Sequence, residues 1–409
     1  MDSRLALQCA LEPGRVTHEL VARWDQFEWA GSDLVAAEVA RVHERGDAYS
    51  LDLDLYLTGS NGSGLMRVLA EFVPGDVEGR VSSLRRELRR GADRRHGFDG
   101  SGLAAVPALQ LLVRRPGLDR RLPLLDLLHR PETATQVLSP YFGGGKVDID
   151  LIGHRLEEKA ILRACSGGSC LILKGYDTRS ELPERIMSLA AYLKRRARPG
   201  RAVPGPIGLL ASHRAVVWDE PAGAENSQWS PVGGVDDIEA IGGALRWLHE
   251  VPQRNLPIHD VAAELVVLAR SQRLLEAGWP ALAAFVSTTM VYLAGGLVAL
   301  ESWPFATVHG DAHPGQFVVR DGGVAILGVE SFSVGEPAID LGNYGAYLTI
   351  AGRADTDAHL HAGYQSHQDL IDRASAWRDA GLFRLGVQLA LSTDRADQGR
   401  RILVDLSAG

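Results

Sequence analysis

The chain has 409 residues, of which 45% are hydrophobic and 23% are charged, and its formal net charge is -8 at pH 7. A chain of this length is long enough for two packed domains, or for one bilobal enzyme with an extra domain. The negative net charge argues against a nucleic-acid-binding protein, because such proteins normally present a basic stripe.

The cysteines indicate a reducing compartment. There are three, at positions 9, 165 and 170, and their spacing is not that of a metal site. Cys165 and Cys170 flank a turn at 166–169 and would face each other across a hairpin, but low cysteine usage favours free thiols over a disulfide. The chain starts at Met1 without a basic and then apolar segment, so we expect a cytoplasmic protein.

Residues 1–145 are predicted to form a mixed α and β region. The apolar residues from Val35 to Arg45 have helical spacing and predict a helix. Leu51 to Thr58 alternates as a strand and is expected to return through a turn into Leu65 to Phe72. The arginine-rich stretch from Val81 to Arg95 predicts a solvated helix. The glycine run at 143–145 is expected to mark the end of this region.

Residues 146–225 predict a smaller, β-rich lobe. The expected elements are strands at 147–152, 159–164 and 171–174, a helix with Ile186, Leu189, Ala190 and Leu193 on one apolar face, and a strand at 215–218. Lys174 ends the third strand, where its charge would suit nucleotide phosphates. Glu181 or Glu184 on the helix is a candidate partner for this lysine, although an exposed helix charge explains either glutamate equally well.

The polar motif of the chain lies between Val308 and Leu341, within a region that is mainly helical from Asp236 onward. Asp311 sits on a tight loop, where a carboxylate can orient an acceptor hydroxyl and take its proton during phosphoryl transfer. A turn aspartate is the alternative, and the neighbouring His309 and the hairpin that follows favour the catalytic role. The imidazole of His309 is expected to hold the loop through backbone hydrogen bonds.

Gln316 and Glu330 are the candidate metal ligands. Mg²⁺ prefers hard oxygen ligands at about 2.0–2.1 Å, and the amide oxygen of Gln316 is one; a polar residue at a strand start is the alternative. A hairpin turn is predicted at 321–323. Beyond it, Gly328 and Glu330 would face the same side of a strand, about 6.6 Å apart. Glu330 would then point into the space that Gly328 leaves, and a surface glutamate is the alternative. Asp340 is expected to cap a helix or to tie the catalytic loop.

These residues resemble the aminoglycoside phosphotransferase and choline kinase family over about 146–409. The matching positions are His309-Gly310-Asp311, Gly335-Glu336-Pro337-Ala338 and Asp340-Leu341, and more loosely Lys174, Glu220-Pro221-Ala222-Gly223 and Leu245 to His249. The family pattern has an asparagine where this chain has Gln316, and a magnesium-bridging aspartate where it has Gly328.

The resemblance implies an α+β fold: a bilobal, protein-kinase-like enzyme with a β-rich lobe at 146–225 and a helical lobe at 226–409. The helical lobe would carry the catalytic loop at 309–316, and the α+β region 1–145 would precede both lobes. The implied cofactors are ATP and Mg²⁺, with Lys174, Glu184 and Glu220 binding the nucleotide. The implied reaction moves the γ-phosphoryl group to a hydroxyl of a small molecule or a modified peptide.

The missing aspartate at Gly328 leaves a second hypothesis open. Metal charge stabilisation contributes several kcal/mol, so the loss of one ligand would slow the reaction by orders of magnitude. The chain would then be a pseudokinase that binds a nucleotide or peptide as the partner of another enzyme. Gln316 and the unassigned first 145 residues favour this alternative too.

Ala281 to Leu300 has no charge over about one membrane thickness of helix. Its serine, threonine and glycine residues favour a fully buried helix beneath the active site. A membrane span and a partner-binding surface are the alternatives.

Overall fold

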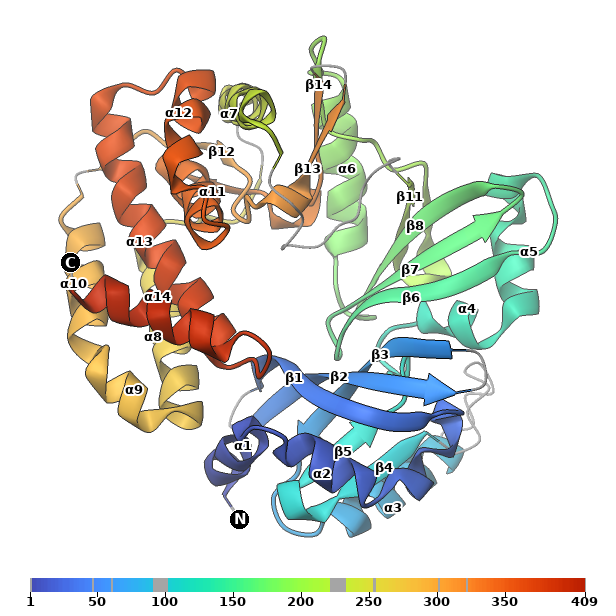
Figure 1. Cartoon of the computed structure of the whole chain (residues 1–409). Helices are drawn as coiled ribbons and strands as arrows, with labels where there is room; N and C mark the ends of the chain where they lie inside the picture. Colours follow the sequence, from blue (N-terminus) through green and yellow to red (C-terminus); the bar gives the residue numbers. More distant parts are fainter. Residues whose placement is uncertain are drawn as a thin grey trace.

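Three groups of elements follow one another in a ring-like arrangement in the computed structural model (Figure 1). The structure describes residues 2–45, 48–59, 62–90, 102–220, 233–252, 255–300, 302–320 and 323–408. In chain order the groups are an N-terminal sheet with its helices, a second sheet with its helices, and a largely helical part that ends the chain.

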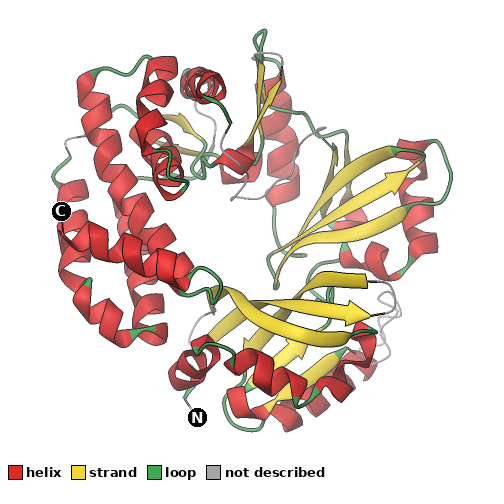
Figure 2. Cartoon of the chain, in the orientation of Figure 1, coloured by secondary structure: helices red, strands yellow, loops and turns green. Residues whose placement is uncertain are grey.

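The N-terminal sheet is antiparallel, in the order β1-β2-β3-β5-β4. Its elements are α1 (Ser3–Leu11), α2 (Arg15–Val21), η1 (Trp24–Ala30), β1 (Asp33–Arg45), β2 (Ala48–Gly59), β3 (Gly62–Phe72), α3 (Val77–Arg90), β4 (Leu103–Val106), η3 (Pro107–Leu109) and β5 (Leu111–Arg114). Leu51, Leu53 and Leu55 of β2 are fully buried in one core with residues of α1 and α2. On the other face of the sheet, α3 packs over β4 and β5 (Figure 2).

The predicted helix from Val35 to Arg45 is wrong, because these residues lie in β1. The predicted strands over 51–58 and 65–72 are confirmed as parts of β2 and β3. Two register shifts in β1 explain the error: Val35 and Ala40 are extra residues without a partner on β2. Each shift moves the alternation by one, so Val39 and Val42 both face the buried leucines of β2. A spacing of three on a bulged strand therefore resembled the spacing of a helix.

The second sheet is also antiparallel, in the order β10-β11-β8-β7-β6. It comprises β6 (Asp148–Arg155), β7 (Lys159–Ser166), β8 (Ser169–Tyr176), β10 (Gly208–Leu210) and β11 (Ala215–Asp219), with η4 (Ala211–His213) before β11, and with helices α4 (Leu125–His129), α5 (Pro131–Phe142) and α6 (Leu182–Lys194). Leu138 of α5 shares a core with Leu162 and Leu173 of the sheet. The packing of the second sheet therefore begins before the glycine run at 143–145, where the sequence placed a boundary.

Cys165 and Cys170 form a disulfide, against the expectation of free thiols. The two residues are directly opposite each other in the register of β7 and β8, with their Cα atoms 4.2 Å apart. The low number of cysteines led to the expectation of a reducing compartment and free thiols. It carries no information on the distance between these two cysteines, which the β7–β8 hairpin brings together.

The helical part contains α7 (Val235–His249), α8 (Val261–Gly278), α9 (Pro280–Phe285), α10 (Ser287–Val298), α11 (Ala338–Ile350), η7 (Ala354–Thr356), α12 (Asp357–Tyr364), α13 (Gln368–Ala390) and α14 (Ala396–Ala408). Short strands and turns sit among these helices and carry the polar motif. They are β12 (Ala306–Val308), η5 (Pro314–Gln316), β13 (Phe317–Arg320), β14 (Gly323–Ile326), η6 (Val329–Ser331) and β15 (Ser333–Gly335). β12 pairs with β15, and β14 pairs with both β13 and β9 (Arg201–Ala202).

The expectation of one buried helix over 281–300 is wrong. The segment forms α9 and α10, and its outer face is exposed: Phe285 by 58%, Val291 by 69%, Tyr292 by 71% and Val298 by 63%. On α10, the buried residues Thr289, Leu293 and Leu297 form a single stripe. None of the described helices is both long and apolar enough to cross a membrane.

Candidate active site

Asp340, in the first turn of α11, holds the loop that follows β12. Its Oδ2 accepts from the backbone N–H of His309 (2.6 Å) and from Nε2 of His249 (2.9 Å), and its Oδ1 accepts from the backbone N–H of Gly310 (2.9 Å). Complete burial acts to raise the pKa of Asp340, but the hydrogen bond and the charge of His249 hold that pKa below its ordinary value. Of the two roles expected for Asp340, a helix cap or a tie to the loop, its bonds to the backbone of His309 and Gly310 show the tie to the loop.

His309 is fully buried and fastens the same loop from the other side. Its Nε2 donates to the carbonyl oxygen of Leu327 (3.0 Å), and its Nδ1 accepts from the backbone N–H of Asp311 (3.2 Å). These two bonds require the neutral imidazole with its proton on Nε2. Gly310 between them has φ 76°, and a Cβ there would lie 2.8 Å from the carbonyl oxygen of Ser331. The expected loop-holding role of His309 is confirmed.

Asp311 emerges from this fixed loop with 52% of its side chain exposed. Its Oδ2 lies 3.8 Å from Nε2 of His313. Burial lowers the pKa of His313 to about 4, so this imidazole is neutral near pH 7 and leaves the negative charge of Asp311 intact. Its Nδ1 accepts from the backbone N–H of Gly315. The result is an accessible carboxylate on a rigid support, which suits the orientation of a hydroxyl.

Gln316 and Gly328 are in direct contact. Gly328 has φ 67° and precedes η6, so the chain turns there and the expectation that 328 and 330 share one face of a strand is wrong. A Cβ at Gly328 would lie 2.5 Å from Oε1 of Gln316 and 2.8 Å from its Cδ. The glutamine amide therefore fills the space that a side chain at 328 would need. The longer side chain of Gln316 and the missing side chain at Gly328, the two departures from the family pattern, are therefore sterically complementary.

Glu330 is clamped by two lysines. Its Oε1 accepts from Nζ of Lys174 (2.9 Å) and from Nζ of Lys159 (3.4 Å). Burial acts to raise the pKa of Glu330, but the charges of the two lysines lower it to about 2, so Glu330 is ionised. Burial also lowers the pKa of Lys159. Lys159 was not predicted from the sequence. In the β7–β8 hairpin Ile161 lies opposite Lys174, so Lys159, two residues before Ile161, lies on the same face of the sheet as Lys174 and diagonal to it.

Of the two alternatives for Glu181 and Glu184, a pairing with Lys174 is not found in the described part of the chain, because Lys174 pairs with Glu330. Glu184 pairs with Arg214, which follows η4, and Glu181 is the N-cap residue of α6. Lys174 instead projects across to Glu330, because its strand faces the segment after β14. Glu220, the other expected nucleotide-binding residue, accepts from Nε (2.8 Å) and Nη2 (2.9 Å) of Arg163. The rest of its motif, 221–223, lies outside the described residues, as do positions 321 and 322 of the expected hairpin turn.

The donor groups do not fit a magnesium ion held by Gln316 and Glu330. The amide oxygen of Gln316 faces a glycine where a carboxylate would be needed, and Oε1 of Glu330 already binds two cations that would repel a dication. Among the described residues, no group of three or more His, Cys, Asp or Glu side chains is arranged to hold a metal.

A small pocket lies between the second sheet and the segment after β14. Ile172, Trp218, Ile326 and Leu327 form its apolar walls, and Lys174 and Gly328 also line it. Its volume of about 30 Å³ is below the range of small-molecule sites. Its apolar walls next to a lysine suit the position of a base and its phosphates, but a nucleotide would need the walls to move apart.

Residues 158–377, more than half of the chain, match APH, described as the phosphotransferase enzyme family. The chain belongs to this family. The expected resemblance is thereby confirmed, and its most specific residues, His309 to Asp311 and Asp340, are those that build the fixed loop.

The spectinomycin phosphotransferase APH(9)-Ia, crystallised with ADP and spectinomycin, is similar in structure. Its TM-score is 0.51 at 13% identity, covering 68% of this chain and 98% of its own. A choline/ethanolamine kinase family protein from Mesorhizobium loti has a TM-score of 0.46 at 16% identity, covering 68% and 93%. The Plasmodium vivax ethanolamine kinase has a TM-score of 0.46 at 12% identity, covering 71% and 95%. No curated protein matches the chain.

The first of these likenesses shows the fold. This phosphotransferase-family protein has the expected bilobal, protein-kinase-like α+β fold, with an additional N-terminal α+β region. The second sheet with α6 forms the β-rich lobe, and the helices from α7 onward form the helical lobe that carries Asp311 (Figure 1).

Proposed function

We propose that the protein is an ATP-dependent phosphotransferase that acts on a hydroxyl of a small molecule or of a modified peptide. The observation that carries this proposal is the open carboxylate of Asp311 on a loop fixed by Asp340 and His309. The apolar pocket beside Lys174 supports a nucleotide site between the lobes.

In the proposed reaction, Asp311 accepts a hydrogen bond from the acceptor hydroxyl and orients its oxygen toward the γ-phosphorus of ATP. A bond forms between that oxygen and phosphorus, and the bond from phosphorus to the bridging oxygen breaks. The electron pair leaves with ADP, and the hydroxyl proton passes to Asp311. Lys174 and Lys159 lie where their charges can offset those of the phosphates, once these compete with Glu330 for the two lysines.

A pseudokinase that binds nucleotide without efficient transfer is the second candidate. The contact between Gln316 and Gly328 favours it, since it removes the carboxylate position that normally bridges a metal. The pairing of Glu330 with both lysines favours it too, because the phosphate-binding charges are already partly neutralised.

Two measurements separate these functions. The first is the thermal stability of the full chain with ADP or ATP, in Mg²⁺ and in EDTA, which reports nucleotide binding without an acceptor. The second is ADP formation from ATP with a panel of hydroxyl compounds. We expect Asp311→Asn to lower that rate about 10²–10⁴-fold, with nucleotide binding unchanged. Asp369→Asn, an exposed acid of α13, is the control and should have no effect.

Unchanged turnover in Asp311→Asn would refute the role of Asp311. Nucleotide binding without turnover of any compound would establish the pseudokinase instead. Absence of nucleotide binding would refute both candidates.

A further inference from the structure

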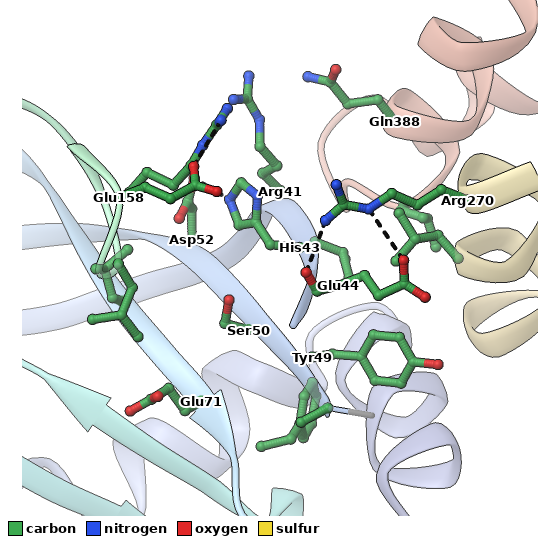
Figure 3. A pocket seen from close by; sticks show the side chains of 18 of the residues that line it. Arg41, His43, Glu44, Tyr49, Ser50, Asp52, Glu71, Glu158, Arg270 and Gln388 are labelled. Carbon is green, nitrogen blue, oxygen red and sulfur yellow. Dashed lines mark hydrogen bonds and ion pairs between the residues drawn. The ribbon is translucent and has the colours of Figure 1, made fainter. Parts of the chain in front are cut away.

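A cavity of about 800 Å³ lies between the N-terminal sheet, the turn before β7, and helices α8 and α13 (Figure 3). This volume is within the range of small-molecule binding sites. A second cavity of about 430 Å³ lies between the N-terminal sheet and β6 and β7, and reaches Lys159. Arg41, His43 and Asp52 line both cavities.

The wall that the N-terminal sheet contributes is polar although it lies inside the molecule. Arg41 and His43 come from β1, Ser50 and Asp52 from β2, and Glu71 from β3. Ser50 and Asp52 are only 4% and 6% exposed. A polar sheet face ordinarily borders bulk water. Here it borders the cavity, which opens to solvent, so a ligand can reach the side chains that line it.

A bulge directs Arg41 into this cavity. Val39 opposes Leu53 and faces the apolar core, whereas Arg41, two positions later, opposes Asp52. In a regular strand these two residues would share one face. The extra residue Ala40 reverses the alternation and brings Arg41 and then His43 to the polar face. Bulges that re-aim a side chain are frequent beside binding sites.

Among the described residues, Arg41 lacks the direct ion pair that its charged neighbours make, although the charge of Asp52 is near enough to oppose the lowering of its pKa by burial. In the lining, Glu44 pairs with Arg270, Glu158 with Arg155, Glu157 with Arg121, Glu71 with Arg114 and Arg384 with Glu264. Within the described parts of the chain, the Arg41 guanidinium makes no hydrogen bond or ion pair. Asp52 lies opposite, but its Oδ2 accepts from Nε2 of His43 (3.2 Å).

Arg41 is half-buried, and burial lowers its pKa. A guanidinium nevertheless stays charged in proteins, and its planar fork matches a carboxylate or a phosphate. A guanidinium that is partly removed from water, and whose N–H donors make no hydrogen bond within the described residues, is suited to an anionic ligand.

The catalytic loop lies near this cation. Val39 exchanges two hydrogen bonds with Thr393 after α13, from N to Oγ1 (2.9 Å) and from Thr393 N to Val39 O (2.8 Å), which attach β1 to the helical lobe. On that lobe the Tyr347 ring lies 5.4 Å from the ring of His313, which contacts Asp311. Burial raises the pKa of Tyr347; Asp311 raises it further, and Arg384 and Arg41 oppose this. Tyr347 thus packs beside His313, and the charges of both Asp311 and Arg41 act on its pKa.

We propose that the phosphoryl acceptor carries an anionic group, a carboxylate or a phosphate, which Arg41 binds in this cavity. The N-terminal region then forms one wall of the acceptor site, and the helical lobe supplies Asp311. This inference rests on the proposed function for the position of the reacting hydroxyl.

The test uses three linear polyols of equal length: sorbitol, gluconate and sorbitol 6-phosphate, which are neutral, a carboxylate and a phosphate. Their binding to the full chain is measured by calorimetry with AMP-PNP present to occupy the nucleotide site. We expect one or both anions to bind at least about tenfold more tightly than sorbitol, because a charge-assisted hydrogen bond from the Arg41 guanidinium is stronger than one to a neutral hydroxyl. The stronger of the two identifies the anionic group.

Arg41→Gln should remove that preference, and Arg41→Lys, which keeps the charge but loses the fork, should retain part of it. Arg80→Gln is the matched control, because Arg80 pairs with Glu87 on α3 and does not line the cavity. Thermal unfolding of each variant confirms that it is folded. Equal binding of the three polyols, no binding of any of them, or an anion preference that survives in Arg41→Gln would each overturn the inference.

The outcome is separable from that of the proposed function. Anion binding that depends on Arg41 in a protein that never turns over ATP would leave the anion site standing and refute the phosphotransferase. Turnover of a hydroxyl compound with no dependence on Arg41 would support the phosphotransferase and refute the anion site.

Discussion

An aspartate at position 328 should destabilise the protein unless Gln316 is shortened at the same time. Gly328→Asp places a side chain at φ 67°, which we estimate to cost about 1 kcal/mol. It also brings a Cβ to 2.5 Å from Oε1 and 2.8 Å from Cδ of Gln316. Relief of such an overlap in a packed site costs about 1–3 kcal/mol. The expected loss is therefore about 2–4 kcal/mol in the free energy of unfolding.

Gln316→Asn withdraws the amide by one methylene. Alone, it should cost about 1 kcal/mol through the lost contact. Combined with Gly328→Asp, it should remove the overlap and leave mainly the backbone cost. The double variant should thus be more stable than the sum of the single variants predicts, by about 1–3 kcal/mol.

Denaturant unfolding of the wild type, both single variants and the double variant measures this coupling. Gly352→Asp is the matched control, since Gly352 has φ 69° with no atom within 4 Å of its Cβ position, and it isolates the backbone term. Additivity of the two substitutions within about 0.5 kcal/mol would refute the steric argument. If the argument holds, nucleotide binding that depends on Mg²⁺ should increase in the double variant and not in Gly328→Asp alone.

Three further predictions concern the carboxylates. The pKa of Glu330 is about 2 in the fold and 4.5 in its absence, so its ion pairs stabilise the fold above about pH 4.5 by up to about 3 kcal/mol and lose that effect toward about pH 2. Glu330→Gln should flatten stability against pH in this window, and parallel curves would contradict the assignment. Glu184→Gln should leave ADP affinity within about twofold, because Glu184 pairs with Arg214; a larger loss would show that it acts on Lys174. Asp340→Asn should lower unfolding free energy by about 3–5 kcal/mol by weakening the bonds to His249, His309 and Gly310, and a loss below about 1 kcal/mol in chemical denaturation would refute its anchoring role.

The parts of the fold that the sequence predicts well are those whose signal is local. The alternation of Leu51 to Thr58 specifies a strand because each leucine meets the core on its own. The loop at His309 to Asp311 could be predicted because its fixed shape depends on hydrogen bonds between two short sequence motifs, the loop itself and the segment that begins with Asp340. The bulges at Val35 and Ala40 could not be read in this way, because a bulge is defined by the partner strand.

The electrostatic partners were harder to predict, since they depend on how lobes far apart in sequence meet. Lys174 is 156 residues from Glu330, and either glutamate of α6 was the simpler choice by proximity in the chain. The exposed face of α10 was mistaken for a buried one because an uncharged segment indicates apolar character without saying how many sides are covered. The contact of Gln316 with Gly328 could have been inferred from their joint departure from the family pattern.

The two unusual features of the site have a common electrostatic consequence. Where the family pattern places an aspartate, this chain has a glycine, and the neutral amide of Gln316 fills the space beside it. One negative charge is therefore missing beside the pocket proposed for the nucleotide. Lys159 and Lys174 share the single carboxylate of Glu330, so the local balance without nucleotide is positive. Lysine side chains would therefore attract phosphates that enter this site. In the family pattern, a metal ion held by the aspartate supplies that positive charge. The absence of an aspartate at Gly328 and the presence of two lysines around Glu330 therefore act in the same direction. Together they favour nucleotide binding that depends less on Mg²⁺ than the family pattern implies.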